Sequence, residues 1–200
     1  YRYGLSLYTP DDPTWDPDIW LSSGERGTFL HEVFESFATQ FADRRSELLS
    51  ASASEVMGAI MDANIAKWRS LVPPPRGVVV DREIAELRRA ALSFLEMERE
   101  AFSNGDARAW RFLEYAFGKP KPDGIYMLSD GSSLNVKGRV DRIDEISDDS
   151  FRVIDYKTGS PNKYSKIQKQ GRFNGARQLQ PAIYSGVLAR MLNGTVASFE

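Results

Sequence analysis

The sequence predicts an α/β fold in which a mixed central sheet is flanked by helices and interrupted by a helical insertion. Two observations lead to this prediction. The first half of the chain shows apolar residues at helical spacing, up to about residue 102. From residue 124 onward, short runs typical of strands alternate with turn residues, and a helical stretch and a further strand follow. The order of helix, three antiparallel strands, helix and strand defines an α/β core with a mixed sheet.

The N-terminal half is expected to be helical after an irregular start. The first twenty residues are rich in proline and aspartate, which favour turns. Ser22 and Glu25 then have the spacing of a capping box, and the helix that they begin carries an apolar stripe: Leu30, Val33, Phe34, Phe37 and Phe41. Two more helical stretches, at about 46–71 and 81–102, are separated by the breaker VPPPRG at 72–77. We interpret them as an insertion without recognisable chemistry.

The C-terminal half is expected to build the sheet. Residues 107–117 form a helix or a strand lead-in, and 124–128, 134–144 and 150–157 are strand candidates joined by hairpin-type turns at 129–132 and 147–149. Residues 162–175 are polar and predict a loop, 176–192 predict a helix, and 195–200 begin another strand. Residues 1–200 thus read as one domain, with its core at about 22–45 and 107–200 and an insertion at about 46–105. The chain starts at Tyr1 and stops inside an expected strand, so we expect a fragment of a longer protein.

Composition narrows the possible chemistry. The chain is 42% hydrophobic and 27% charged, as in ordinary globular proteins. It has no apolar run near the ~20 residues of a membrane span and no signal peptide, so we expect a cytoplasmic protein without a membrane partner. Its lack of cysteine excludes disulfides, thiolate zinc sites and cysteine-held iron–sulfur clusters. Any metal must be bound by oxygen and at most one histidine, which favours Mg²⁺ or Mn²⁺.

Charge is distributed unevenly although the net charge is only −2. Residues 157–199 contain no Asp or Glu but seven basic residues, whereas residues 141–155 are acidic. An acidic edge that suits a cation therefore precedes a segment that attracts phosphate. The alternative is a solvated loop that is basic without a function.

The acidic edge is formed by residues 138–144, GRVDRID, and residues 153–159, VIDYKTG. Because side chains alternate along a strand, Asp155 and Lys157 are expected on the same face, beside Asp141 from the preceding strand. Two carboxylates and the backbone carbonyl of Tyr156 are suitable ligands for Mg²⁺ or Mn²⁺, and a nearby lysine can orient water or contact a phosphate. Asp155 and Lys157 could instead form a solvated ion pair of little energetic value.

Five pieces in this order together resemble the PD-(D/E)XK nuclease superfamily, in its RecB/AddB-type branch of helicase–nucleases and CRISPR-associated exonuclease-like relatives. They are residues 27–31 (GTFLH), 112–114 (FLE), 138–144, 153–159 and 180–184 (QPAIY). The resemblance covers residues from about 24 to 199 and implies a restriction-endonuclease-like core. Some relatives hold an iron–sulfur cluster with cysteines, which this chain lacks.

The resemblance also implies roles for individual residues. His31 matches a metal ligand from the first core helix, Asp141 and Asp155 match two metal-binding carboxylates, and Lys157 matches the catalytic lysine. Glu114 is a weaker match to an upstream glutamate near the metal. The element on the following helix that lies beside the site and the nucleic acid corresponds to Gln180 and Tyr184.

Other interpretations of these residues remain open. His31 could be an ordinary helix-edge residue and Tyr184 a core residue. Asp144 is expected to be a turn residue rather than a ligand. The sequence does not decide whether Arg139 and Arg142 contact phosphate or pair with local acids.

The leading functional hypothesis is a Mg²⁺- or Mn²⁺-dependent deoxyribonuclease domain, an exonuclease acting on single-stranded DNA or DNA ends in repair or recombination. Its expected partners are DNA and a helicase domain or subunit. The alternative is a catalytically inactive nuclease-fold module that binds DNA or a partner subunit. A third possibility is the same chemistry in a restriction or CRISPR-adaptation nuclease.

Overall fold

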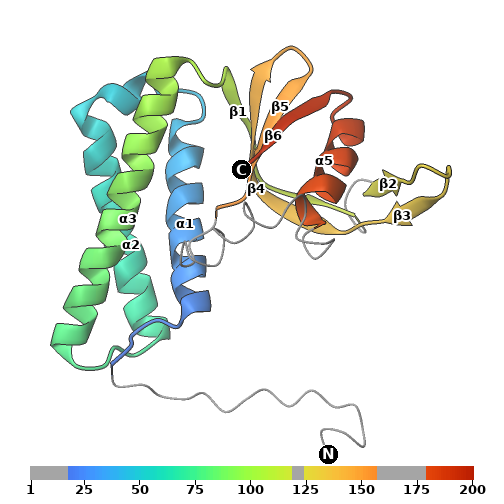
Figure 1. Cartoon of the computed structure of the whole chain (residues 1–200). Coiled ribbons are helices and arrows are strands. Elements are labelled where there is room, and N and C mark those ends of the chain that lie inside the picture. Colours follow the sequence, from blue (N-terminus) through green and yellow to red (C-terminus); the bar gives the residue numbers. More distant parts are fainter. Residues whose placement is uncertain (1–17, 119–123, 157–178) are drawn as a thin grey trace, which may run out of the picture.

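The computed structural model describes residues 18–118, 124–156 and 179–200 (Figure 1). The helices in this part of the chain are α1 (Ser23–Phe41), the 3-10 helix η1 (Arg45–Leu49), α2 (Ala51–Leu71), α3 (Gly77–Asn104) and α5 (Gln180–Met191). The strands are β1 (Ala109–Phe117), β2 (Ile125–Met127), β3 (Ser133–Asn135), β4 (Gly138–Ser147), β5 (Ser150–Ile154) and β6 (Thr195–Phe199). None of the helices in these ranges combines the length and the hydropathy needed to cross a membrane.

The main sheet has four strands in the order β1-β4-β5-β6. β1 pairs with β4 and β4 with β5 in antiparallel fashion, whereas β5 and β6 are parallel. A parallel pair needs a crossover connection, and α5 lies in the chain segment between β5 and β6. The sheet is therefore mixed, which confirms the predicted α/β class.

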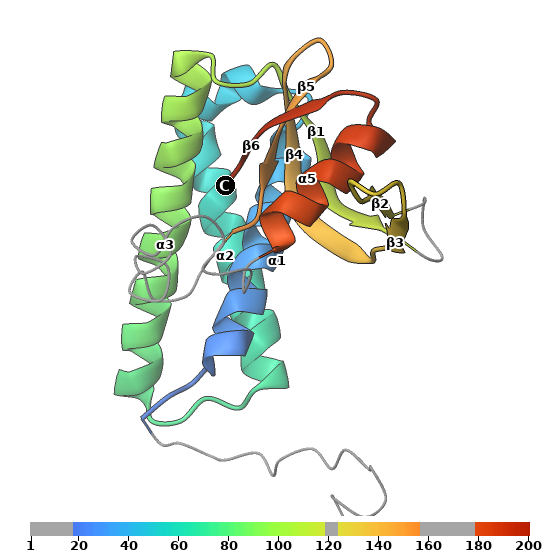
Figure 2. The same ribbon diagram turned by 45° about the vertical axis from the view of Figure 1, so that its right-hand side comes forward.

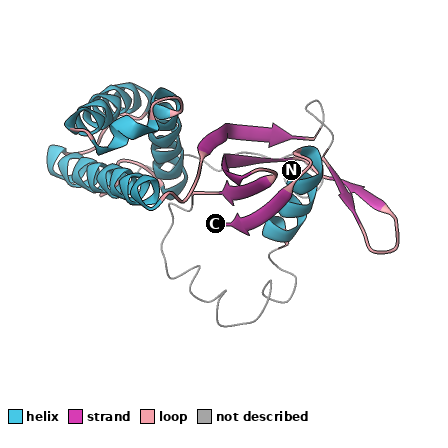
Figure 3. Cartoon of the chain, turned by 90° about the horizontal axis from the view of Figure 1, so that it is seen from above, coloured by secondary structure: helices cyan, strands magenta, loops and turns pink. Residues whose placement is uncertain are grey.

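Helices cover the two faces of the sheet, as seen from above in Figure 3. One apolar core joins α1, α2 and α3 to the sheet through Trp110. A second core lies between the sheet and α5, where Val153 of β5 and Val187 of α5 are fully buried. The long helices α1, α2 and α3 run side by side in Figures 1 and 2, so the expected insertion packs as a bundle with the first helix.

Helix α1 begins where the sequence predicts. The Ser22 hydroxyl accepts a hydrogen bond from the Glu25 backbone N–H at 3.3 Å, and the Glu25 carboxylate accepts one from the Ser22 N–H at 2.8 Å. This capping box satisfies two backbone donors that have no partner within the helix. The predicted apolar stripe is buried along the whole of α1. Helix α1 also carries His31, whose side chain is partly exposed next to the buried stripe.

Several element boundaries differ from the prediction. Residues 134–144 do not form one strand but two, β3 and β4, which lie in different sheets. At this interruption the backbone of Gly118 and Gly124 lies so close to Val136 that a Cβ atom on either glycine would collide with the Val136 carbonyl. Of the stretch 107–117, residues 109–117 form the strand β1, and the second helical stretch opens with η1 before α2 begins. The predicted loop 162–175 and the predicted helical start at 176–178 lie outside the described residues.

Candidate metal centre

Three side chains from three separate elements meet at one edge of the sheet. His31 comes from α1, Glu114 from β1 and Asp141 from β4, and one ligand atom of each lies within 4.8 Å of the others. They line a groove with a cavity volume of about 590 Å³. The strand pairing explains the approach of the two carboxylates: the pairs Leu113–Arg142 and Tyr115–Val140 bracket Glu114 and Asp141, which places these two residues opposite each other.

Asp141 is the centre of this group. One of its carboxylate oxygens lies 3.1 Å from Nδ1 of His31, and the other accepts the backbone N–H of Tyr156 at 2.5 Å. The second ring nitrogen of His31, Nε2, lies 3.1 Å from the Tyr156 carbonyl oxygen. Both ring nitrogens therefore face acceptors, and only the protonated ring can donate to both. The hydrogen bond to Asp141 is the main cause of the raised pKa of His31.

Glu114 reaches the group through an unusual backbone conformation. Its φ angle is +47°, a left-handed value that a residue with a Cβ atom seldom adopts inside a strand. Burial raises the pKa of the Glu114 carboxyl, and the negative charges of Asp141 and Glu35 raise it further. Backbone strain of this kind concentrates at functional sites. The position of Glu114 in the group and its strained backbone thus add a geometric argument to its weak match to the family pattern.

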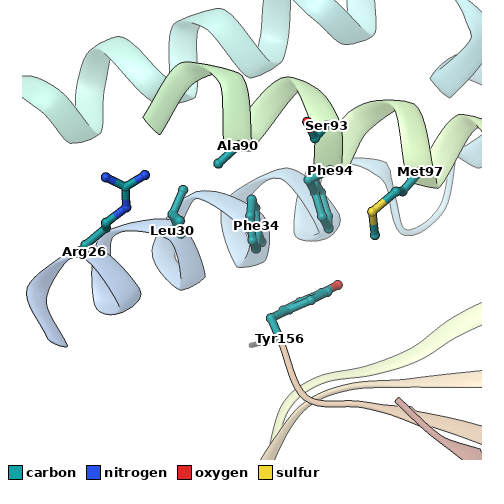
Figure 4. A pocket seen from close by; sticks show the side chains of 8 residues that line it. All are labelled: Arg26, Leu30, Phe34, Ala90, Ser93, Phe94, Met97 and Tyr156. Atoms are coloured by element: carbon teal, nitrogen blue, oxygen red, sulfur yellow. The ribbon is translucent and has the colours of Figure 1, made fainter. Parts of the chain in front are cut away.

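Tyr156 connects the group to the helical bundle. Its ring packs edge-on against Phe34 of α1 and Phe94 of α3, with ring centroids 5.2 Å and 5.6 Å apart. Figure 4 shows this ring facing Phe34 and Phe94 across the pocket between the two helices and the sheet. Because the side chain is fixed in this way, the Tyr156 carbonyl and N–H stay directed at His31 and Asp141. The sequence prediction assigned only the Tyr156 carbonyl and missed this role of the ring.

The groove also contains acids that the sequence prediction did not assign. Glu32 and Glu35 line it, with Gly27, Thr28 and Arg139. Glu32 is already engaged, since its carboxylate accepts from Lys67 at 2.8 Å and from the Trp68 ring N–H at 2.9 Å. Glu35 is the residue four positions after His31, so helical spacing alone places it on the same face. That spacing is a signal the sequence offered for Glu35.

The donor set fits a divalent cation. It combines an imidazole nitrogen and two carboxylates, with the Tyr156 carbonyl next to the histidine ring. Carboxylate and carbonyl oxygens suit Mg²⁺ and Mn²⁺, and an imidazole is compatible with Mn²⁺. The pKa values of His31 and Glu114 are both raised, so these side chains bind protons more readily than usual. A bound cation would displace such protons. The residues present therefore fit a divalent metal of this class.

Asp155, another expected site residue, is not among the described side chains of this group. Asp155 follows the last residue of β5, and its backbone N–H donates to the Glu200 carbonyl at 2.8 Å. It lines a second cavity, together with Glu98 and Arg152. Lys157 lies outside the described residues, as does most of the basic segment 157–199 that the sequence singles out. The roles of Asp155 and Lys157 stay predictions.

Gln180 and Tyr184, the expected site residues on α5, lie away from this group. Tyr184 packs against the second apolar core, between the sheet and α5. The Tyr184 ring packs edge-on against Phe117 at 4.8 Å and lies over Gly138, where a Cβ atom would collide with it. Gln180 is exposed at the first turn of α5. Tyr184 thereby fixes the start of β4, the strand that carries Asp141. Neither residue lines the groove of His31 and Asp141.

The two arginines of the 138–144 motif have different partners. Arg142 is buried and lies 2.7 Å from Glu98 and 2.8 Å from Asp144. Asp144 is fully buried within β4, so the prediction of a turn residue was wrong; its carboxylate is a partner for Arg142 and also for Arg152. Arg139 is 65% exposed and lies 3.1 Å from Glu114 in the groove.

Protonation of His31 gives a testable pH dependence. The folded state raises the pKa of His31 above 6.5, so the ion pair with Asp141 stabilises the metal-free protein fully below that pH. This contribution is lost as the pH rises through the folded-state pKa. A cation requires the neutral ring, so the increase in Tm caused by Mn²⁺ should grow between about pH 6 and about pH 8.

Differential scanning fluorimetry with and without Mn²⁺ measures this increase at each pH. A His31→Gln variant, which cannot titrate, serves as the control and should show a much flatter pH dependence. An increase in Tm that stays constant with pH in the wild-type protein contradicts the assignment of His31 to the metal group.

Comparisons with known proteins identify the family of this chain. The family model described as PD-(D/E)XK nuclease superfamily matches residues 1–198. Among curated proteins, the chain is similar to bacterial proteins that are named as a subunit of an ATP-dependent helicase/deoxyribonuclease. The identity is 25% over 179 residues for Clostridium perfringens (strain SM101 / Type A), 24% over 148 for Clostridium tetani and 27% over 153 for Pelotomaculum thermopropionicum.

These matches cover 84%, 70% and 70% of this chain but only 15%, 13% and 12% of the respective relatives. The chain thus spans about one seventh of the length of the curated relatives that it matches. The family model, in contrast, extends over almost the entire sequence. This chain belongs to the PD-(D/E)XK nuclease superfamily.

Proposed function

We propose that this chain is a metal-dependent DNA nuclease domain that hydrolyses phosphodiester bonds. The observation that carries the proposal is the convergence of His31, Glu114 and Asp141 from three elements on one groove. A half-buried acid pair beside a histidine is costly to maintain without a ligand, and a divalent cation offsets that cost. The relatives are named as deoxyribonuclease subunits, which supports DNA as the substrate.

The chemistry divides among the residues as follows. A bound Mg²⁺ or Mn²⁺ would supply charge neutralisation at the phosphate and a water of lowered pKa. Asp141 is held by the Tyr156 N–H and contacts His31, so both side chains are oriented before a ligand arrives. Glu114 adds a second carboxylate from β1. We assign to Lys157 the orientation of the attacking water, and to Asp155 a further metal contact after a rearrangement at the end of β5.

The finer assignment extends to substrate and setting. We propose exonuclease action on single-stranded DNA or DNA ends, in repair or recombination, with a helicase domain or subunit as partner. The name of the relatives, which joins helicase and deoxyribonuclease, supports this partner. We place the activity in the cytoplasm. Gln180 and Tyr184 are proposed to contribute beside the site through the position of β4.

A second candidate is a catalytically inactive module that binds DNA or a partner subunit. One observation favours it: the Asp155 carboxylate is not among the side chains gathered with Asp141. A retired site would bind DNA in a salt-dependent way without cleavage.

A cleavage assay on labelled single- and double-stranded DNA, with Mg²⁺, Mn²⁺ or EDTA, decides between the two candidates. We expect cleavage with either ion and none with EDTA, and a loss of about a hundredfold in Asp155→Ala and in Lys157→Ala. Full activity in both variants would remove Asp155 and Lys157 from the mechanism. DNA binding without any cleavage by the wild-type protein would establish the second candidate.

A further inference from the structure

The two arginines of the 138–144 motif differ in what they can contact. Arg142 is 3% exposed and its guanidinium is occupied by Glu98 and Asp144, so it cannot reach a nucleic acid. Arg139 starts from β4 three residues earlier, and 65% of its side chain is exposed. It lines the groove of His31 and Asp141. The question left open by the sequence, phosphate or local acid, therefore concerns Arg139 alone.

Arg139 faces one of the candidate metal ligands. Its Nη1 atom donates to Oε2 of Glu114 at 3.1 Å. The hydrogen bond and the positive charge of Arg139 lower the pKa of Glu114, against the larger effects of burial, Asp141 and Glu35, which raise it. Arg139 thus acts as the cation of Glu114 in the metal-free protein. A divalent ion bound by Glu114 and Asp141 would compete with it for the same carboxylate.

The groove needs a positive group if it is to receive a phosphodiester. Its described lining includes four carboxylates, of Glu32, Glu35, Glu114 and Asp141. Among these described lining residues, Arg139 is the one Lys or Arg. A guanidinium presents a planar set of donors that matches two phosphate oxygens. The start of β4 is also held firmly, since the Tyr184 ring lies against Gly138, the residue before Arg139.

We propose that Arg139 is a phosphate-binding residue that is exchanged between Glu114 and the DNA backbone when the metal binds. The inference rests on the proposed nuclease function and adds a coupling between its two ligands. Without metal, Arg139 neutralises Glu114. With metal, the cation takes over Glu114 and leaves the guanidinium available to a phosphate at the groove. Metal and DNA then favour each other's binding through one side chain.

The test is the Arg139→Gln variant, with Arg111→Gln as the matched control. Arg111 lies on the neighbouring strand β1, is 59% exposed and has an acidic neighbour, Glu145, at 3.9 Å, but does not line the groove. Calorimetry measures Mn²⁺ affinity without DNA. Fluorescence anisotropy measures the affinity for a labelled oligothymidylate in Ca²⁺, across a salt series. Neither readout requires turnover.

Arg139→Gln should bind Mn²⁺ about threefold to tenfold more tightly, because a competing positive charge is removed. It should bind the oligothymidylate about tenfold more weakly, with a salt slope reduced by about one. Arg139→Lys, which keeps the charge but loses the fork, should lie between wild type and Arg139→Gln in DNA affinity. Arg111→Gln should change neither affinity.

The opposite signs separate the proposal from a structural defect, which would weaken both ligands together. Weaker Mn²⁺ binding by Arg139→Gln, or DNA binding equal to that of the wild type, overturns the proposal. The proposed nuclease function fails by a different result, the absence of metal-dependent cleavage by the wild-type protein. The two failures are therefore distinguishable in the same set of samples.

Discussion

Replacing Asp141 with Asn is expected to lower metal-dependent DNA cleavage about a thousandfold, the largest effect of any single substitution in this chain. The Asp141 carboxylate contacts the His31 ring and accepts the Tyr156 N–H, and it is one of three clustered ligands. The amide has the same shape but no charge, and it offers only one acceptor oxygen. The variant therefore loses the charged ligand and can no longer accept hydrogen bonds from both His31 and the Tyr156 N–H.

Three measurements check this expectation. Cleavage rates give the catalytic loss, and calorimetry should show Mn²⁺ affinity lowered by about tenfold to a hundredfold. The pH titration of His31 by NMR should move toward its ordinary pKa, because the hydrogen bond to Asp141 is the main cause of the upward shift.

The matched control is Glu145→Gln on the same strand. Glu145 lies four residues after Asp141, is 27% exposed and faces Arg111 rather than the groove. The Glu145→Gln variant should cleave DNA at the rate of the wild-type protein. If Asp141→Asn retains wild-type cleavage while its Mn²⁺ affinity is unchanged, Asp141 is not a metal ligand and the site lies elsewhere.

Local signals in the sequence predicted the elements that place this site. The capping box at Ser22 and the apolar stripe of α1 determine where His31 lies, because both act within one or two helical turns. The mixed sheet also followed from element order. The break between β3 and β4 was harder to predict, since the residues that lie closest to Val136 there, Gly118 and Gly124, come from elsewhere in the chain.

For the candidate site, the sequence suggested individual residues more readily than their geometry. Motif order suggested His31 and Asp141, and the structure brings them to within 3.1 Å. No periodicity predicts the positive φ that Glu114 adopts inside β1. Asp155 illustrates the converse. Alternation along β5 applies only up to Ile154, so the direction of the next side chain is set by local contacts rather than by the pleat.

The α3 helix shows why an insertion without sequence motifs can still matter to the site. Glu98 of α3 reaches across to the sheet and contacts Arg142, one residue after Asp141. The Arg142 guanidinium lies 5.0 Å from the Trp110 ring and 5.8 Å from the Tyr156 ring. Burial lowers the pKa of Arg142, but its neighbours, Tyr156, Glu98 and Asp144 among them, outweigh this and raise it overall. A buried ion network thus ties the bundle to the strand and the tyrosine of the metal group.

Removing Glu98 is expected to cost about 3 kcal/mol or more of the free energy of unfolding. The Glu98 side chain is 4% exposed and that of Arg142 is 3% exposed, so Glu98→Ala leaves a desolvated guanidinium with less negative charge around it. The matched control is Glu96→Ala on the same helix, whose carboxylate is 67% exposed and pairs with Arg99 at a distance of 2.8 Å. It should change stability by less than about 0.5 kcal/mol, because exposed pairs contribute little.

Urea denaturation followed by circular dichroism measures both variants. Combining Glu98→Met with Arg142→Met should recover much of the loss, since no unpaired charge remains on either side of the former contact. Mn²⁺ affinity provides the link to function. Glu98→Ala should weaken it at temperatures where the variant is still folded, because Arg142, which lies near the Tyr156 ring, loses this partner. Equal stability of Glu98→Ala and Glu96→Ala would mean that the bundle does not support the site through this ion pair.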